Sequence, residues 1–73
     1  MIAFHQMNEF TVGERELILQ ALFKKPEVIK RILEGSQIIR VDGTRHPEVF
    51  EVFFYGTTPG LSVIEVGIDL LDL

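Results

Sequence analysis

The side chains whose chemistry comes closest to a reactive site are Arg40, Arg45, His46 and Tyr55. An arginine holds phosphate groups well, and a histidine or tyrosine can transfer a proton. The four residues fall on, or at the ends of, neighbouring segments with strand character, so one sheet face could collect them. Such a group predicts a site that binds or cleaves RNA without a metal ion.

The overall charge argues against nucleic acid as a partner. The chain carries 7 Lys and Arg residues against 11 Asp and Glu residues, which gives a formal net charge of −4. Nucleic-acid-binding proteins usually present a basic face, because contacts to phosphate supply most of their affinity. The RNA-directed site is therefore an alternative hypothesis. A second alternative is a small ligand bound between protomers, with Tyr55 and Arg40 as polar contacts.

Metal and cofactor chemistry has little support in the sequence. Asp42, His46 and Glu48 cluster in one segment, and His5 lies far from them in the chain. Metal sites usually show a tighter spacing, such as two histidines four apart on a helix. The chain has no cysteine, and its serines have no identifiable base partner. We expect no metal site, no cofactor and no catalytic residue, which favours a protein that is not an enzyme.

Two helices are predicted in the first half of the chain. Thr11 and Glu14 fit the capping-box pattern, which predicts a helix over residues 12–24. Pro26 suits the first position of a second helix, over residues 26–34, and Gly35 suits its end. We expect the pair to form a helical hairpin. Its buried stripes are predicted to be Leu17, Ile18, Ala21 and Leu22, extended by Phe23, and then Val28, Ile29, Ile32 and Leu33.

After Gly35 the apolar period changes from that of a helix to that of a strand. Strands are predicted over residues 37–42, 48–55 and 61–70, with turn residues at 42–47 and at Pro59–Gly60. Short connections imply an antiparallel meander with residues 48–55 in the centre. Residues 1–73 are thus predicted to be one α+β domain, a helical hairpin packed on a three-stranded meander. Residues 1–8 are a candidate for a short N-terminal strand, with an ordered but irregular arm as the alternative.

This order of elements, two helices and then a small antiparallel sheet, resembles that of small ribonuclease toxins of the RelE type. The resemblance lies in element order, and no family motif accompanies it. It implies RNA cleavage by residues of the sheet face, which is the RNA-directed alternative described above.

The central segment, residues 49–55, is apolar on both faces if it forms a strand. One face would carry Phe50, Val52 and Phe54, and the other Val49, Phe53 and Tyr55. A strand with one face in water would instead alternate apolar and polar residues. Two helices can cover only one face of the sheet, so the other face is left either for a partner or for the N-terminal arm and the C-terminal tail of the same chain. The sequence leaves open which face the helices cover.

These observations favour self-association. A chain of 73 residues buries only about 60% of its unfolded surface, and without cysteine it has no disulfides to supplement its core. We predict a small soluble interaction or regulatory protein that acts as a homo-oligomer, or with another protein, through Val49, Phe53 and Tyr55 or through Phe50, Val52 and Phe54. The edges of strands 37–42 and 61–70 offer a second route.

No membrane role is predicted. No segment approaches the roughly 20 consecutive apolar residues that span a bilayer. The first residues, 1–7, lack the basic region and the long apolar core of a signal peptide. The expected location is the cytoplasm.

Overall fold

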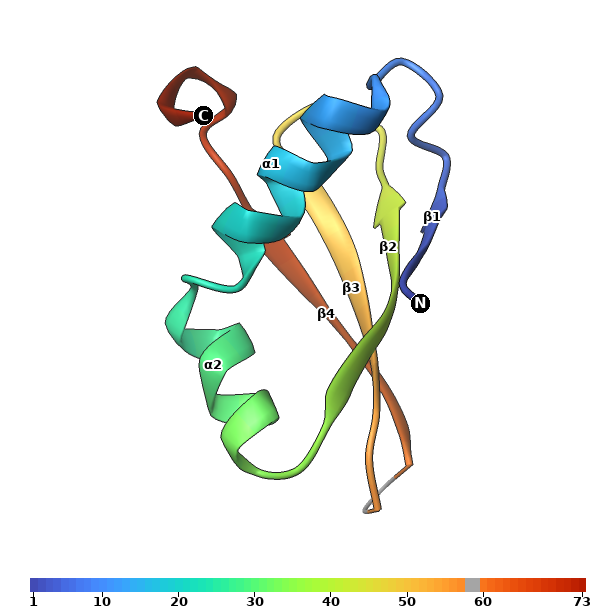
Figure 1. Ribbon diagram of the computed structural model, residues 1–73, viewed down its shortest axis with the longest axis vertical. Helices are drawn as coiled ribbons and strands as arrows, with labels where there is room; N and C mark the ends of the chain where they lie inside the picture. The colour runs from blue at the N-terminus through green and yellow to red at the C-terminus, as the bar shows by residue number, and fades with distance from the viewer. Residues whose placement is uncertain (58–59) are drawn as a thin grey trace.

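The sheet has four strands in the order β1-β2-β3-β4 (Figure 1). The computed structural model describes residues 1–57 and 60–73. Strands β2, β3 and β4 form an antiparallel meander, and β1 pairs with β2 in parallel. The predicted α+β class is therefore confirmed, including the short N-terminal strand. The elements are β1 (Ala3–His5), α1 (Val12–Leu22), α2 (Pro26–Leu33), β2 (Gln37–Gly43), β3 (Val49–Tyr55), β4 (Leu61–Gly67) and the 3-10 helix η1 (Leu70–Asp72).

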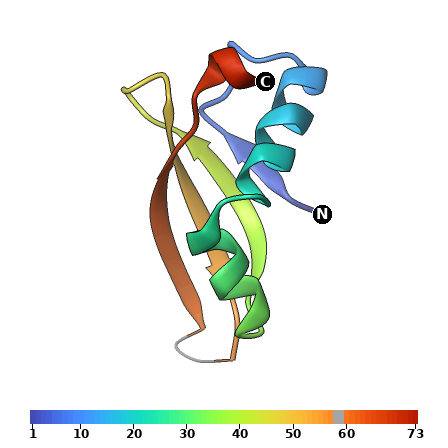
Figure 2. The same cartoon turned by 90° about the vertical axis from the view of Figure 1, so that its left-hand side faces the viewer.

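Both helices lie on the same side of the sheet (Figure 2). They follow one another along the sheet, with α1 over one end and α2 over the other (Figure 1). The chain bends at Lys25, which has an extended ψ of 132° before Pro26 starts α2, as residues that precede proline prefer. The predicted hairpin is thus an open pair of helices, and the two cover the length of one sheet face.

The start of α1 is set by side-chain capping. The Thr11 hydroxyl accepts a hydrogen bond from the Glu14 amide at 3.1 Å, and the Glu14 carboxylate accepts one from the Thr11 amide at 2.8 Å. These two bonds satisfy amide groups that have no partner within the helix. The capping box predicted from the sequence is therefore confirmed.

Replacing the cap is expected to cost stability. Thr11→Ala should lower the free energy of unfolding by about 1 kcal/mol, because the Glu14 amide loses its acceptor. Thr11→Ser keeps the hydroxyl and should cost less than half of that. Urea unfolding followed by circular dichroism measures both variants, and equal losses in the two would contradict this role for the hydroxyl.

The core lies between the helices and one face of the sheet. The central strand contributes Phe50, Val52 and Phe54, which are almost completely buried. The predicted helix stripes are confirmed only in part, because each short helix contacts the sheet along a narrow line. Leu33 is 82% exposed, and Leu17, Phe23 and Ile29 are also exposed. The other core residues are Met7, Ile18, Leu22, Val28, Ile38, Val41, Val66 and Ile68.

The N-terminal segment is fixed to the sheet and to α1. Met7 is buried, and the ring of Phe10 lies 5.9 Å from that of Phe50. The Arg15 guanidinium donates hydrogen bonds of 3.0 and 3.2 Å to the Met7 carbonyl. Because β1 pairs with residues 40–42 of β2, the prediction that residues 37–42 form a free edge is wrong for that part of the strand.

A bulge in β2 decides which side chains face the helices. The pairing with β3 shifts by one residue between Ile38 and Arg40, which leaves Ile39 as the extra residue. Ile38 and Val41 therefore both point into the core, while Arg40 and Asp42 point to the opposite face. In a regular strand, Ile38 and Arg40 would share a face.

The last strand is shorter than predicted. It ends at Gly67, and the Asp69 side chain accepts a hydrogen bond from the Leu71 amide to begin η1. Gly60 has a φ of 105°, which suits glycine in the turn before β4. Pro59, the other residue of that predicted turn, lies outside the described residues.

Candidate functional site

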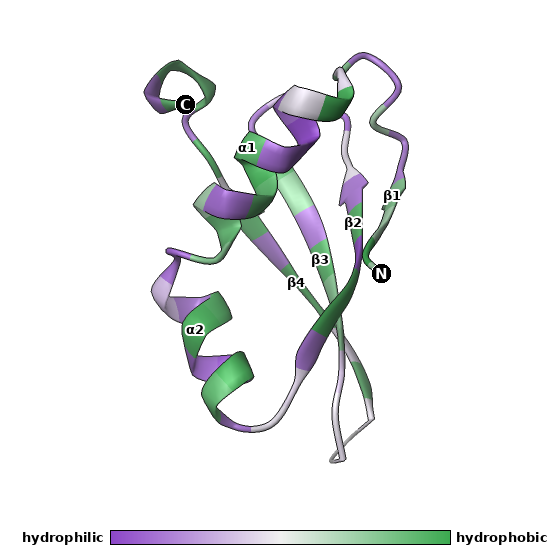
Figure 3. Cartoon of the chain, viewed as in Figure 1, coloured by the Kyte–Doolittle hydropathy of each residue, from purple (hydrophilic) through white to green (hydrophobic). Residues whose placement is uncertain are grey.

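The sheet face opposite the helices carries both apolar and charged side chains, and we call it the open face. Hydrophobic stretches of β3 and β4 are interrupted by a hydrophilic segment on each strand (Figure 3). On β3 the alternation places Val49, Glu51, Phe53 and Tyr55 on this face. The helices cover the other alternative, Phe50, Val52 and Phe54, which leaves no side chain of that set free to contact a partner.

Four bulky apolar side chains form one patch on the open face, which we call the apolar quartet: Phe53, Tyr55, Leu61 and Val63. Phe53 pairs across the strands with Val63, and Tyr55 pairs with Leu61. Tyr55 is 56% exposed, Leu61 61% and Val63 47%, while Phe53 is half-buried. Val49, the remaining apolar residue of β3 on this face, lies opposite Gly67 at the far end of the strand.

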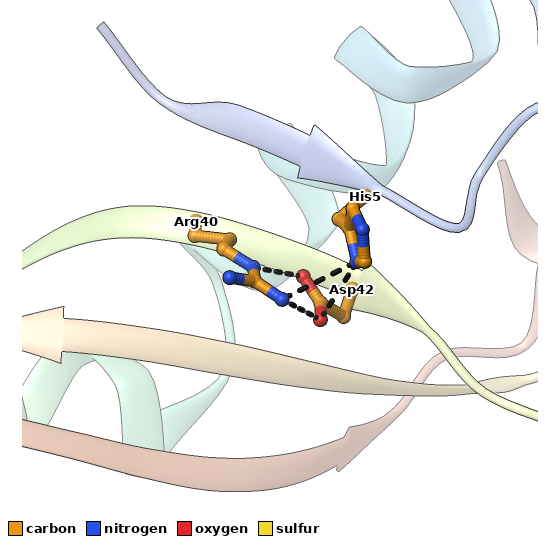
Figure 4. Close-up of polar contacts among 3 residues, drawn as sticks. All are labelled: His5, Arg40 and Asp42. Atoms are coloured by element: carbon orange, nitrogen blue, oxygen red, sulfur yellow. Dashed lines mark hydrogen bonds and ion pairs between the residues drawn. The ribbon is translucent and has the colours of Figure 1, made fainter.

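Beside the quartet, Arg40, Asp42 and His5 form a polar cluster (Figure 4). Arg40 donates two hydrogen bonds of 2.6 Å, one to each carboxylate oxygen of Asp42. This bidentate arrangement is the strong form of the ion pair. The Arg40 guanidinium also lies 4.8 Å from the centre of the Phe53 ring, a cation–π contact that joins the polar cluster to the quartet.

His5 completes the cluster from β1. Its Nδ1 atom is 3.3 Å from an Arg40 nitrogen and 3.4 Å from an Asp42 oxygen. A neutral ring with a bare Nδ1 accepts a hydrogen bond from Arg40, and a protonated ring donates one to Asp42. The cluster can thus accommodate both states of the imidazole, because Nδ1 has a partner in each.

The ion pair changes the acidity of both members. Hydrogen bonds from Arg40 lower the pKa of Asp42 below its ordinary value, against the opposing effect of desolvation. The hydrogen bonds to Asp42 likewise raise the pKa of Arg40. Asp42 is only 6% exposed, because the Arg40 and His5 side chains lie around it.

The lowered pKa predicts a stability contribution that depends on pH. The Asp42 carboxylate stabilises the fold above its unfolded pKa of 3.8, and this contribution is lost as the pH falls through the lower folded value. Asp42→Asn should therefore be less stable than the wild type at pH 7, and the difference should shrink below about pH 4. Urea unfolding at both pH values measures this difference, and a gap of constant size would contradict the prediction.

A row of carboxylates crosses the open face next to the quartet, and we call it the acidic row: Asp42, Glu51 and Glu65. Asp42 pairs with Glu51, and Glu51 pairs with Glu65, on three adjacent strands. The register thus makes Glu51 and Glu65 direct cross-strand neighbours. Like charges directly opposite one another are unfavourable. Arg40 forms an ion pair with Asp42 and also attracts the Glu51 carboxylate more weakly.

The four residues of the RNA-directed hypothesis do not converge. Arg45 and His46 lie in the β2–β3 turn, while Tyr55 is at the opposite end of β3, about 20 Å away along a strand of this length. A surface hollow that Arg45 and His46 line also includes Glu51 and Glu65. These carboxylates would repel a phosphate group.

The side chains weighed as metal ligands have other partners. The His46 Nδ1 atom accepts a hydrogen bond from the Glu48 amide at 3.2 Å. The Glu48 carboxylate accepts one from the Leu70 amide at 3.3 Å, and Asp42 is held by Arg40. For the ligand hypothesis, Tyr55 lines a hollow with Gln37 and glycines of the adjoining loops, and Arg40 is not part of it.

Comparisons with protein-family models, with curated proteins and with solved structures give no significant match to this chain. In the part of the chain that the structure describes, neither helix has the length and apolar character needed to cross a membrane. The open face is therefore assessed on its own geometry and chemistry.

Proposed function

We propose that this chain is a small interaction protein that acts as a homo-oligomer, and that two copies meet through the open faces of their sheets. The apolar quartet is the observation that carries this proposal. It is a continuous patch of large apolar side chains on paired strands, and the two helices are already used to cover the other face. Exposed patches of this kind commonly mark interaction sites.

The composition of the quartet also fits an interface. Aromatic residues near the centre of a contact surface usually contribute most of the binding energy. Phe53 sits on the central pair of strands, with Tyr55 next to it on the same face. Charged and polar residues flank the patch in the acidic row and the Arg40 cluster, as in the polar rim of a typical interface.

The alternatives receive less support from the geometry. The RNA-directed hypothesis needs its arginines and proton-transfer groups in one site, but Arg40 is bound to Asp42 and Tyr55 is distant from His46. Arg45 and His46 share a hollow with two carboxylates, those of Glu51 and Glu65, which would repel phosphate. A ligand between protomers would have to bind where Tyr55 and Arg40 both reach. Their positions in the sheet do not bring them into one hollow.

A pair of variants tests which surface associates. Val63→Glu places a charge within the quartet, next to the acidic row, and should raise the dissociation constant about 10-fold or more. Leu33→Glu makes the same kind of change at an exposed site on α2 and should leave association unchanged. Sedimentation velocity at several concentrations measures both variants. Dissociation by Leu33→Glu alone would place the contact on the helical layer and overturn the proposal.

A further inference from the structure

The side chains of the open face form rows across the strands, and the rows differ in charge and polarity. The strand register aligns Asp42, Glu51 and Glu65 in the acidic row, with His5 at its β1 end. The next row has Arg40, Phe53 and Val63, and the row after it has Gln37, Tyr55 and Leu61. The charge is therefore concentrated at one end of the strands, and the quartet lies toward the other end.

This order distinguishes between the two ways in which identical sheet faces can stack about a two-fold axis. If the axis runs along β3, each row lies over the same row of the second copy. Glu51 then faces its own counterpart, and Asp42 faces Glu65 of the second copy. Like charges brought together across an interface strongly disfavour the complex, and among the described residues of the acidic row only Asp42 forms an ion pair.

If the axis instead crosses the strands between Phe53 and Tyr55, the rows are exchanged. Phe53 then faces Tyr55 of the second copy, and Val63 faces Leu61. Both acidic rows move to opposite rims of the interface, where water solvates them. Arg40 comes to lie opposite the uncharged Gln37 of the second copy.

We propose that two copies pack face to face with their β3 strands antiparallel, about an axis that crosses the sheet between Phe53 and Tyr55. This inference rests on the proposed function, since it names the partner as a second copy and gives its orientation. The charge pattern is the observation that selects it. The quartet is self-complementary in this orientation. Repulsion between the two acidic rows disfavours the other orientation, in which the axis runs along β3.

The area available indicates a weak contact. Three strands of seven residues and β1 of three, with strands about 4.8 Å apart and about 3.3 Å per residue, give the whole face a footprint of about 400 Å². A standard interface buries about 800 Å² of accessible surface on each partner. About an axis between Phe53 and Tyr55, only the rows of these two residues overlap with the second copy. The contact therefore covers less than half of the face, and interfaces below the standard size are typical of weak, transient complexes.

The chain contains no cysteine, so single cysteines report on the orientation without further changes. Packed sheets lie about 10 Å apart. In the proposed dimer, the two copies of residue 55 are offset by one row, about 7 Å, and the two copies of residue 51 by three rows, about 20 Å. A homobifunctional thiol reagent with a reach of about 10 Å should therefore link Tyr55→Cys and leave Glu51→Cys unlinked. Leu61→Cys is a second position that should be linked.

Each outcome has a distinct meaning. Linkage of Tyr55→Cys or Leu61→Cys without linkage of Glu51→Cys, in samples that sediment as dimers, supports the proposed orientation. Linkage of Glu51→Cys as well means that the axis runs along β3 and overturns it. A dimer in which none of the three is linked overturns face-to-face packing and points to pairing of β4 edges or to the helical layer. A wild type that sediments as a monomer at all concentrations means that the proposed function itself has failed.

Discussion

Phe54→Ala is expected to lower the free energy of unfolding by about 3 to 5 kcal/mol. The Phe54 side chain is fully buried between the sheet and the helices, so its truncation leaves an enclosed cavity in the core. The Arg31 guanidinium, 5.6 Å from the ring centre, loses its aromatic contact as well. A domain of this size has about 5 kcal/mol of stability in total, so the variant should retain no more than about 2 kcal/mol and should unfold at a much lower urea concentration than the wild type.

The neighbouring substitution Phe53→Ala is the matched control. It removes the same atoms from the other face of the same strand, where Phe53 is only half-buried, and should cost roughly 1 kcal/mol. Urea unfolding at low protein concentration gives both values, and Phe54→Leu provides a milder core change of about 1 kcal/mol. Equal losses for the two alanine variants, or a larger loss for Phe53→Ala, would mean that the helices cover the other face.

The same Phe53→Ala variant should have its main effect on association. Truncation of a central aromatic residue in an interface typically costs 2 kcal/mol or more, which corresponds to a dissociation constant raised about 30-fold or more. The variant should remain folded, because Phe53 is not part of the core. Sedimentation equilibrium of wild type and variant measures the difference.

Ile29→Ala is the control for this second prediction. Ile29 is 40% exposed on α2, so the change truncates an apolar side chain on the opposite layer of the molecule. It should leave the dissociation constant within about twofold of the wild type. A dissociation constant for Phe53→Ala equal to that of the wild type would place the contact outside the quartet.

Much of the fold follows from local signals. Thr11 and Glu14 mark the start of α1, and Pro26 marks the start of α2, because capping and proline chemistry act over a few residues. The meander follows from its short connections, which also made Glu51 and Glu65 neighbours. The end of β4 was harder to predict, since Ile68 continues the apolar alternation and Asp69 starts η1.

The assignment of the two faces could not be read from the sequence, because β3 is apolar on both. It depends on contacts between distant segments, such as Phe10 against Phe50. It depends also on the bulge at Ile39, which turns Ile38 toward the core and Arg40 away from it. No local pattern in the sequence predicts that bulge.

The candidate site, like the fold, could be predicted from the sequence only in part. Arg40 and Asp42 stand two apart on a predicted strand, a spacing that places them on one face and could have suggested their ion pair. His5 could not have been added, because it reaches them through the parallel pairing of β1 with β2. The predicted convergence of Arg45, His46 and Tyr55 overlooked that the turn and the end of β3 lie at opposite ends of the sheet.

Sedimentation equilibrium of the wild type, from about 1 μM to about 1 mM, tests the central proposal most directly. We expect the mean mass to rise with concentration from that of the 8.3 kDa chain toward twice that value. The corresponding Phe53→Ala curve should be displaced to higher concentration. A wild type that keeps the mass of a single chain over the whole range would contradict the proposal that the open face binds a second copy.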